Sequence, residues 1–291
     1  MQYRGSIVIP AHNEELRIRT LLQSLTDDSI RGNVAVFVIC NGCSDRTREV
    51  AEEYAGITVV TIDDAGKHFA LNEGDRLAHD IFPRLYCDAD VRIEASSVTA
   101  LIQALTTSAT VAAGPQVEYG TDKCSWGIKK YYQALKSPIL SKWLSVHLSG
   151  RGLYGTSHEA RKRFDTFPPL LADDKFFDAQ YRDDEKQTVS GCNVIVSVPT
   201  TLRQLIRSEA RVARGNQEFN SYLDVPHLNL ASSTSRPSPR RNIERLRTLR
   251  EWARELRRRD WIPMAVYLYV TCVARLYLAV TKARRRQVSW A

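Results

Sequence analysis

Two carboxylates stand one residue apart at the end of an apolar run, in the segment "LYCDADVRIE" (residues 85–94). Asp88 and Asp90 repel each other unless something positive lies between them. Oxygen ligands of this kind suit Mg²⁺ or Mn²⁺, and a divalent ion held by one or two carboxylates keeps open positions for phosphate oxygens. The alternative is a pair of solvated turn residues, because acidic side chains are common in turns.

The elements that must position these acids are predicted by hydrophobic periodicity. Four apolar strands, "SIVIP", "VAVFVIC", "ITVVTI" and "RLYCDAD", alternate with helical patterns in the first third of the chain. Such alternation predicts a parallel sheet covered by helices on both faces. Polar groups follow the four strands: "PAHNEE", "NGCSDRT", "DDAGKHFALNEG" and "DAD". We expect all four on one side of the molecule, where ligands bind in sheets of this kind.

Beyond residue 95 the pattern changes. A helix is predicted over 96–108, a strand over 110–120, a glycine-rich turn over 149–161 and a basic helix over 200–216. Residues 231–241, "ASSTSRPSPRR", are typical of a linker.

Composition bounds the class of protein. The 291 residues are 43% hydrophobic and 25% charged, enough for one sizeable core or two small domains. The formal net charge of +8 is concentrated after residue 200, which favours a polyanionic partner such as a membrane face, a nucleic acid or a diphosphate. The six cysteines show no framework spacing, so we expect free thiols in a reducing cytoplasm. "MQYRGSIVIP" does not have the pattern of a signal peptide, so export is not expected.

The four polar groups, taken in order, resemble the family 2 glycosyltransferases. Members typically read P-x-x-N-E, N-x-x-S-x-D-x-T, G-K-x-x-A-L-N-x-G and D-x-D, and this chain has "PAHNEE", "NGCSDRT", "GKHFALNEG" and "DAD" at suitable spacing. "GLYGTSHEARKRF" and "ADD" resemble the family's acceptor-side turn and its catalytic acid pair. The likeness runs to about residue 220 and implies an inverting enzyme that depends on a nucleotide-sugar.

The alternation of strands and helices, the Ser/Pro/Arg-rich segment and the resemblance together predict a fold and a domain plan. The fold is α/β: a GT-A (Rossmann-like) mixed, mainly parallel sheet flanked by helices, with a C-terminal helical appendage. The plan gives a catalytic domain over 1–225, with a nucleotide-binding half (1–95) and an acceptor half (96–225). A linker over 226–241 and a basic, apolar membrane-associating segment over 242–291 follow.

Carried over residue by residue, the resemblance places a donor site at the strand ends. Its implied residues are Pro10, Ala11, Asn13, Glu14, Asn41, Asp45, Lys67, Asn72, Asp88 and Arg211 for the nucleotide-sugar, and Asp90 with Asp88 for Mn²⁺ or Mg²⁺. Lys67 would neutralise a donor phosphate. Alternatives stay open: Asn13 and Asp45 could cap helices, Lys67 could be an exposed lysine, and Asn72 could tie a helix to a strand.

The acid pair of "LADDKFF" completes the implied chemistry. An acceptor hydroxyl must lose its proton as it attacks, which requires a carboxylate within hydrogen-bond reach. The family pattern makes Asp174 this base and Asp173 its orienting neighbour, and displacement from the far face inverts the anomeric centre. The alternative is an acidic first turn of a helix, favoured by the helix dipole.

The chain departs from the family pattern near residue 210. Many polymerising members carry Q-x-x-R-W, whereas this chain reads "SEARV" at 208–212 and keeps only Arg211. This favours transfer of one sugar per encounter. Arg207, Arg211 and Arg214 share one helical face, which could contact a diphosphate or be a solvated basic face.

Residues 261–280, "WIPMAVYLYVTCVARLYLAV", are apolar except for Arg275 and are bracketed by basic clusters. Three interpretations stay open: a transmembrane helix, an interfacial helix with aromatic and basic anchors, and a helix packed on the protein or a partner subunit. We therefore expect a cytoplasmic enzyme that is peripheral at, or anchored to, the inner face of the cell membrane.

The predicted partners are a UDP- or GDP-linked sugar donor, a glycan, lipid-linked or small-molecule acceptor, and a membrane surface, with no nucleic acid. Two other functions are kept. A sugar-phosphate nucleotidyltransferase shares a related sheet, but the G-x-G-x-R signature after the first strand is missing. A non-catalytic basic protein that binds nucleic acid or membrane explains the charge but not four polar loops on one sheet edge. The sequence makes no prediction of oligomeric state.

Overall fold

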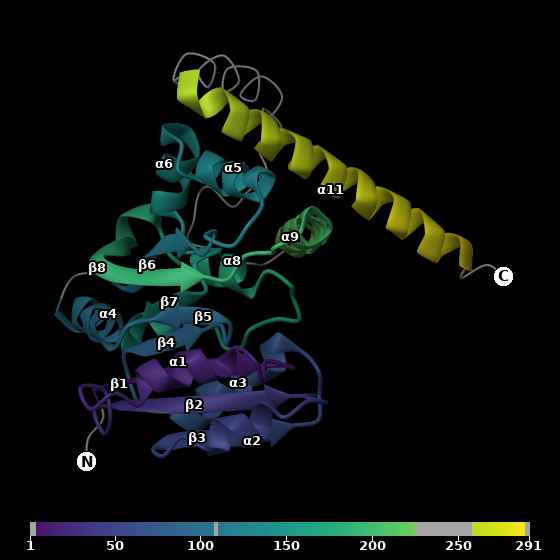
Figure 1. Cartoon of the computed structure of the whole chain (residues 1–291). Helices are drawn as coiled ribbons and strands as arrows, with labels where there is room; N and C mark the ends of the chain where they lie inside the picture. Colours follow the sequence, from purple (N-terminus) through teal and green to yellow (C-terminus); the bar gives the residue numbers. More distant parts are fainter. Residues whose placement is uncertain (1–3, 108–109, 225–257, 289–291) are drawn as a thin grey trace. The chain divides into compact units, whose positions relative to one another are not determined.

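The structure is a computed structural model, and it describes residues 4–107, 110–224 and 258–288 (Figure 1). The described residues form two compact units. The first unit contains residues up to 118 together with 146–197. The second unit contains 119–145, the described residues from 198 to 224, and 258–288.

The first unit is built on one eight-stranded sheet with the order β3-β2-β1-β4-β7-β6-β8-β5. The strands are β1 (Gly5–Ala11), β2 (Val34–Asn41), β3 (Ile57–Ile62), β4 (Arg84–Cys87), β5 (Val91–Ile93), β6 (Ala112–Tyr119), β7 (Leu153–Thr156) and β8 (Lys186–Val196). β1 pairs parallel with both β2 and β4, and β2 pairs parallel with β3. β7 is antiparallel to β4 and β6, and β5 is antiparallel to β8. The sheet is therefore mixed, and its parallel part consists of β1, β2, β3 and β4.

The helices of the first unit are α1 (Ile18–Leu25), α2 (Thr47–Glu52), α3 (Lys67–Ala78), α4 (Ala95–Thr107), α7 (His158–Arg161) and α8 (Asp173–Asp178), with a 3-10 turn, η1, over Asp183–Glu185. α1 and α4 carry apolar residues to one face of the sheet, where the larger core lies. α3 covers the other face and packs against alternate residues of β2, among them Phe37 and Ile39. β1 and β2 are buried along their whole length, as expected of strands covered on both sides.

α3 approaches the sheet closely because of Gly74. A Cβ at this position would lie 2.1 Å from Cγ1 of Val8 on β1. No side chain fits there, so the helix rests directly on the strand. Lys67 begins α3 and the largely buried Asp75 lies in its last turn, so this contact sets the distance of both charged residues from the sheet.

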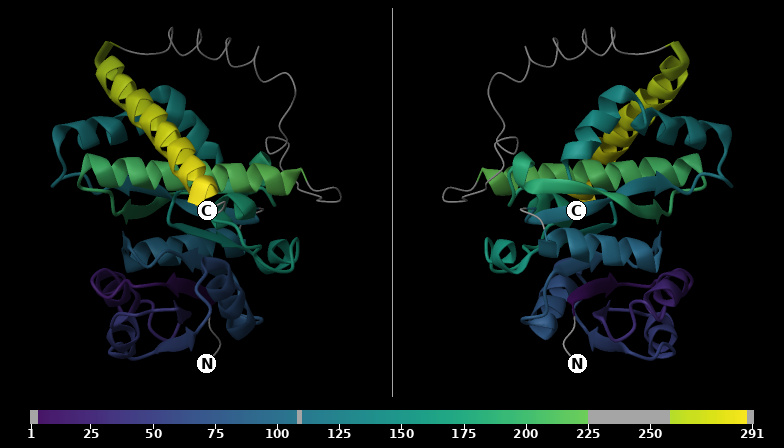
Figure 2. Two further views of the ribbon diagram at one scale, coloured as in Figure 1. Left: turned by 90° about the vertical axis from the view of Figure 1, so that its right-hand side faces the viewer. Right: turned by 90° about the vertical axis from the view of Figure 1, so that its left-hand side faces the viewer.

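The second unit consists mainly of α5 (Trp126–Leu135), α9 (Leu202–Leu223) and α11 (Trp261–Val288), with α6 (Pro138–Val146) and a 3-10 turn, η3 (Arg258–Asp260). α9 begins with a capping box, in which Thr201 accepts from the backbone of Gln204 and the Gln204 side chain accepts in return. Apolar residues of α5, α9 and α11, including Ile128, Leu205 and Val270, form a shared core. Figure 2 shows α11 crossing α9 within this unit.

The predicted fold class is confirmed, with local corrections. The four parallel strands, the flanking helices and the C-terminal helix all occur. The first of the predicted helical patterns begins at Ile18, because residues 12–17 form a loop after β1. The segment 149–161, predicted as a glycine-rich turn, contains strand β7, whose pairing with β4 and β6 no local pattern reveals. All six cysteines are free thiols, as predicted.

The predicted domain plan stays a prediction. The residues assigned to the acceptor half, 96–225, are shared between the two units. The predicted linker, 226–241, lies outside the described residues.

Candidate active site

The loops after β1 and β2 are joined by hydrogen bonds between their polar side chains. Asn13, with a positive φ of 55°, accepts a bond of 2.8 Å on Oδ1 from the Ser44 backbone. Asp45 accepts from the Glu15 backbone at 3.2 Å and from the Thr47 backbone at 3.0 Å. Asn13 thus bridges the loops and does not cap α1, whereas Asp45 both bridges them and supports the start of α2.

The acids of this edge have shifted pKa values. Burial would raise the pKa of Asp45, but the bonds it accepts outweigh burial and hold the pKa below its ordinary value. Burial raises the pKa of Glu14; Arg17 opposes this, and the charge of Asp90 adds to it. Glu14 and Asp90 therefore share one electrostatic environment, as residues of one site must.

The ends of β1 and β2 supply buried positions beside these loops. Pro10 and Ala11 are the last residues of β1 and are buried. Asn41, the last residue of β2, is 2% exposed and donates to the Gly66 carbonyl at 3.3 Å. Its Oδ1 is buried and has no hydrogen-bond partner among the residues that the structure describes. One hydrogen-bond acceptor at this edge of the sheet thus has no donor within the described part of the chain.

Lys67, the first residue of α3, joins acids from two distant parts of the chain. Its Nζ lies 2.7 Å from Oδ1 of Asp88 and 2.9 Å from Oδ2 of Asp173. Burial alone would lower the pKa of Lys67, but Asp173, Asp88 and Asp174 outweigh it and raise the pKa above its ordinary value. The lysine stays a cation among carboxylates.

Asp173 and Asp174 form the first turn of α8. Asp173 is 3% exposed and accepts from the Tyr154 hydroxyl at 2.8 Å. Asp174 accepts from the Gly150 backbone at 2.5 Å. Burial, together with the charge of Asp173, raises the pKa of Asp174 to about 6. The pair is an acidic helix start, as the alternative interpretation stated, and also part of the cluster around Lys67.

The turn before β7 positions two of these acids. Gly150 and Gly152 have positive φ angles of 74° and 67°. A Cβ at Gly152 would lie 2.5 Å from Cγ1 of Val91, so both backbone angle and space require glycine. The Gly152 carbonyl accepts from the Asp88 backbone at 2.8 Å, and Gly150 donates to Asp174. The resemblance marked this segment, but residue types alone did not show what it holds.

Two tyrosines connect the site to a second charged cluster. Tyr86 of β4 and Tyr154 of β7 are partners in the strand register, with ring centroids 5.4 Å apart. Tyr154 donates to Asp173, and Tyr86 donates to Asp75 at 2.8 Å. Sequence reasoning missed both residues, although each is an aromatic residue within a predicted motif.

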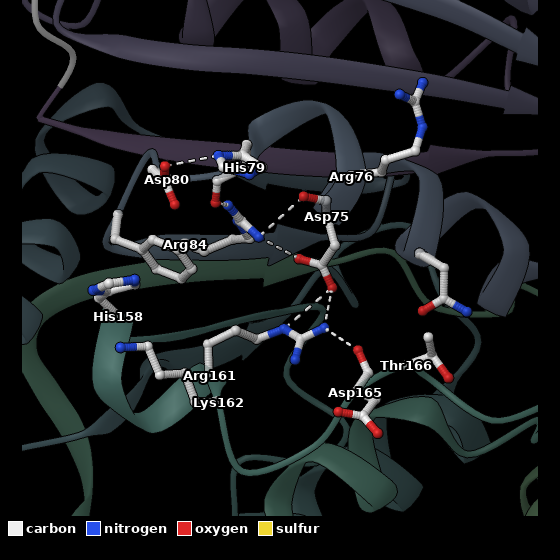
Figure 3. Close-up of a pocket in the computed structure, with 12 residues that line it drawn as sticks. Asp75, Arg76, His79, Asp80, Arg84, His158, Arg161, Lys162, Asp165 and Thr166 are labelled. Atoms are coloured by element: carbon white, nitrogen blue, oxygen red, sulfur yellow. Dashed lines mark hydrogen bonds and ion pairs between the residues drawn. The ribbon is translucent and has the colours of Figure 1, made fainter.

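The second cluster lines a pocket of about 370 Å³ (Figure 3). Arg84 and Arg161 lie on either side of Asp75, with N···O distances of 2.8 and 2.6 Å. Their other N–H groups donate to backbone carbonyls, among them His79 and Phe164. Bases at the rim are paired in turn: Lys162 with Glu159, Arg76 with Glu73, and His79 with Asp80. The basic side chains that line this pocket are thus each paired with an acid of the chain.

Two residues predicted to bind the nucleotide-sugar, Asn72 and Arg211, are not part of the cluster at the strand ends. Both ends of the Asn72 amide are engaged: it donates to the Phe167 carbonyl at 3.0 Å and accepts from the Phe167 backbone at 2.7 Å. This is the structural role that the sequence left open, with a loop segment in place of a strand. Arg211 lies on the exposed side of α9 in the second unit, and its predicted donor contact stays a prediction.

The carboxylates of Asp88 and Asp90 are suitable ligands for a divalent cation whose other ligands come from a phosphate and water. Burial, and then the charge of Asp88, raises the pKa of Asp90, and a cation beside it would relieve both effects. No group of three or more His, Cys, Asp or Glu side chains converges on one point within the described ranges. Two carboxylates with phosphate oxygens and water suffice for Mg²⁺ or Mn²⁺.

The mixed, mainly parallel sheet flanked by helices is the architecture of the GT-A fold. The model of the family described as Glycosyl transferase family 2 matches residues 6–156, just over half of the sequence. The chain belongs to this family.

Curated relatives match a shorter stretch. The 4,4'-diaponeurosporenoate glycosyltransferases of two Staphylococcus aureus strains, RF122 / ET3-1 and MRSA252, are both 38% identical, over 92 and 104 residues. These matches cover 30% and 33% of this chain, and 24% and 27% of the relatives. The chain thus aligns with about a quarter of the length of the curated relatives.

Solved structures share the fold over most of the chain. The mannosyltransferase PcManGT from Pyrobaculum calidifontis, in complex with GDP-Man and Mn²⁺, has a TM-score of 0.57 at 18% identity, covering 97% of this chain and 76% of that one. TarS 1–349 of S. aureus in complex with UDP has a TM-score of 0.52 at 14% identity, covering 95% and 91%. At these identities the likeness establishes the GT-A fold, which confirms the predicted fold.

Proposed function

We propose that this protein transfers one sugar per encounter from a nucleoside-diphosphate-sugar to an acceptor hydroxyl, with inversion at the anomeric carbon. The observation that carries the proposal is the cluster in which Lys67 joins Asp88, at the end of β4, to the acid pair of α8. Groups that we propose for the donor side and for the base side of the reaction are in contact there. The family membership and the fold supply the reaction class.

The donor nucleotide is proposed to lie over the carboxyl ends of β1 and β2. Pro10 and Ala11 would form its floor, and Asp45 would accept from the ribose or base. The unpartnered Oδ1 of Asn41 supports this placement, because a buried acceptor without a donor is costly and a ligand group can supply one. Uracil and guanine are both proposed as the base of the donor, since solved structures of this fold hold UDP and GDP-Man.

Asp90, with Asp88, would hold Mn²⁺ or Mg²⁺ together with the donor diphosphate. When bound, such an ion stabilises negative charge on the leaving phosphate oxygens. Lys67 adds a second positive charge at the same edge. Since Lys67 pairs with Asp88 in this structure, a donor phosphate would compete for the ammonium group and leave Asp88 for the metal or the sugar.

Asp174 is proposed as the general base. The acceptor oxygen forms a bond to the anomeric carbon as the bond from that carbon to the phosphate oxygen breaks. The hydroxyl proton passes to Asp174, and the electron pair of the broken bond stays on the nucleoside diphosphate. A pKa of about 6 leaves Asp174 ionised at neutral pH yet basic enough to take the proton. Asp173, held by Tyr154 and Lys67, fixes its neighbour's position.

The proposed acceptor is a glycan, a lipid-linked sugar or a small molecule. Arg211 would contact a diphosphate of the donor or of a lipid-linked acceptor. The proposed location is the cytoplasmic surface of a membrane, as a peripheral or anchored enzyme, with the membrane surface as a further partner.

The experiment is a screen of UDP- and GDP-sugars with and without Mn²⁺, which measures binding by thermal shift and nucleotide release by a coupled assay. We expect Asp90→Asn to abolish metal-dependent donor binding, because it removes a carboxylate ligand at constant size. Asp28→Asn, an exposed acid beyond the C-terminal end of α1, is the matched control and should change neither readout. Unchanged Mn²⁺ dependence in Asp90→Asn would contradict the metal assignment, and a full screen without binding or turnover would contradict the function.

A further inference from the structure

The C-terminal helix is only half covered by its own protein. On one side of α11, Met264, Val270 and Ala274 are buried, and Tyr267 stacks on Tyr131 of α5 with ring centroids 5.4 Å apart. α11 contacts both α5 and α9 along this side. Only 17% of the most apolar 18-residue stretch of α11 is buried. The helix is therefore not the core helix of a globular domain.

The opposite side of α11 exposes a continuous row of large apolar residues, the α11 stripe. Its residues are Trp261, Ile262, Leu268, Tyr269, Leu276, Tyr277 and Val280, each between 42% and 65% exposed. They recur at helical spacing over 20 residues, a length of about 30 Å at 1.5 Å per residue. A soluble protein rarely leaves such a row in water unless it binds something.

The charge of the residues around the α11 stripe indicates which kind of partner the stripe binds. By sequence, residues 119–145 and 198–291 carry 24 basic and 8 acidic residues, a formal charge of +16. The remaining residues carry 17 basic and 25 acidic residues, a formal charge of −8. Arg258 and Arg259 lie before the stripe, separated from it by Asp260, and "KARRR" follows it. The positive charge is thus concentrated in the unit that carries the apolar face.

We infer that the α11 stripe docks on the surface of an anionic lipid bilayer, with the helix in the plane of the membrane. Aromatic residues at Trp261, Tyr269 and Tyr277 suit the depth of the headgroups, and the bases beside them attract anionic lipid. Leu268 and Leu276 supply apolar contact between these anchors. This inference is independent of the transfer reaction.

The packing of α11 argues against a transmembrane path. A helix that crosses the bilayer would bring the helices on which it packs into the hydrocarbon. α9 exposes Arg203, Arg207, Arg211 and Arg214, and charged side chains inside the bilayer are costly. In the plane of the membrane, the packed side of α11 instead faces the protein and only the stripe enters the interface. Of the three interpretations open from the sequence, the structure favours an interfacial helix that also packs on its own protein.

The test is binding of the full chain to vesicles of phosphatidylcholine, with and without phosphatidylglycerol, measured by co-sedimentation. We expect binding to the anionic vesicles that weakens at least about tenfold between about 0.05 and 0.5 M NaCl, because salt screens the basic residues. The double variant Leu268→Gln/Leu276→Gln should bind at least about 10²-fold more weakly. Since both leucines are exposed, its thermal unfolding should match that of the wild type.

Leu16→Gln is the matched control, because Leu16 is an 88% exposed leucine in the first unit. It should bind vesicles like the wild type. Four outcomes would overturn the inference. The first is no binding to any vesicle, and the second is salt-insensitive binding that does not require phosphatidylglycerol. The third is retention that only detergent reverses after carbonate washing, which indicates a span. The fourth is a dimer in light scattering that the double variant disperses, without vesicle binding, which assigns the stripe to a second copy.

Discussion

Two charged clusters lie along the same pair of elements, α3 and β4, and they are opposite in sign. At the first residue of α3, Lys67 is one cation among the carboxylates of Asp88, Asp173 and Asp174. Two turns further along the helix, Asp75 is one anion between the guanidinium groups of two arginines. Tyr154 and Tyr86, neighbours in the sheet, donate to the first and the second cluster respectively.

The cluster around Asp75 and the cluster around Lys67 differ in whether their charged groups already have all their partners. Around Asp75, ion pairs to its carboxylate and hydrogen bonds to backbone carbonyls use the donors of Arg84 and Arg161. Around Lys67, negative charge is in excess and the pKa values of Asp90 and Asp174 are raised. Carboxylates with raised pKa values are typical of functional sites, whereas networks whose donors all have hydrogen-bond acceptors stabilise folds.

The largest expected effect is on stability, from Asp75→Asn. The change keeps the size of the side chain but leaves two buried guanidinium groups without a counter-charge, and should lower the free energy of unfolding by about 3–5 kcal/mol. Urea unfolding at neutral pH measures it. The folded fraction should still bind donor; lost donor binding at unchanged stability would reverse the roles of the two clusters.

Asp174→Asn should lower the transfer rate without lowering stability, whereas Asp75→Asn should lower stability. We expect transfer to fall by about 10²-fold or more, as it does on loss of a general base, with donor affinity near that of the wild type. Because the raised pKa means that the ionised carboxylate is disfavoured in the folded state, stability at pH 7 should not decrease. Single-turnover transfer and donor titration measure the two quantities. A loss of donor binding would make Asp174 a structural residue and Asp173 the next candidate base.

The pH dependence of the wild-type transfer rate is a second test of Asp174 as the general base. A base acts when deprotonated, so with a pKa of about 6 for Asp174 the transfer rate should be level above pH 6 and fall about tenfold per pH unit below it. An acidic limb near pH 4 would place the base at an unperturbed carboxylate instead.

The smallest effect is expected at a balanced pair nearer the surface. Arg163 binds Glu185 in bidentate fashion at 2.7 and 2.8 Å, and this bond lowers the pKa of Glu185 to about 2. Glu185→Gln should cost about 1 kcal/mol at neutral pH. Since the pKa is depressed on folding, this contribution is present above the ordinary glutamate value and is lost as the pH falls toward 2. The two chains should therefore converge in stability under acid; a constant gap would show that charge is not involved.

The arrangement of β1 to β4 could be predicted from the sequence because it follows from local patterns. Each strand from β1 to β4 is an apolar run followed by a polar loop, and parallel pairing brings those loops to one edge. Asn13 and Asp45 lie there for that reason, as does Lys67 beside Asp88. The roles of these residues toward a ligand rest on the resemblance and remain proposals.

The rest depends on contacts between residues far apart in the chain. β7 was predicted as a turn because it contains glycine, yet Gly155 serves to approach Leu85, whose Cδ2 would lie 2.3 Å from a Cβ there. The bond from Arg161 to Asp75 spans 86 residues, and no sequence pattern marks it. The shared core of α5, α9 and α11 likewise joins three separate stretches.

The uneven distribution of charge between the two units also bears on how the protein behaves in solution. A chain with a negative portion of −8 and a positive portion of +16 is a polyampholyte, so unlike portions of different molecules attract one another. This attraction extends over about 30 Å at 0.01 M ionic strength and only about 8 Å at 0.15 M. Colloidal solubility should therefore rise with added salt, the reverse of what a uniformly charged protein of +8 would show.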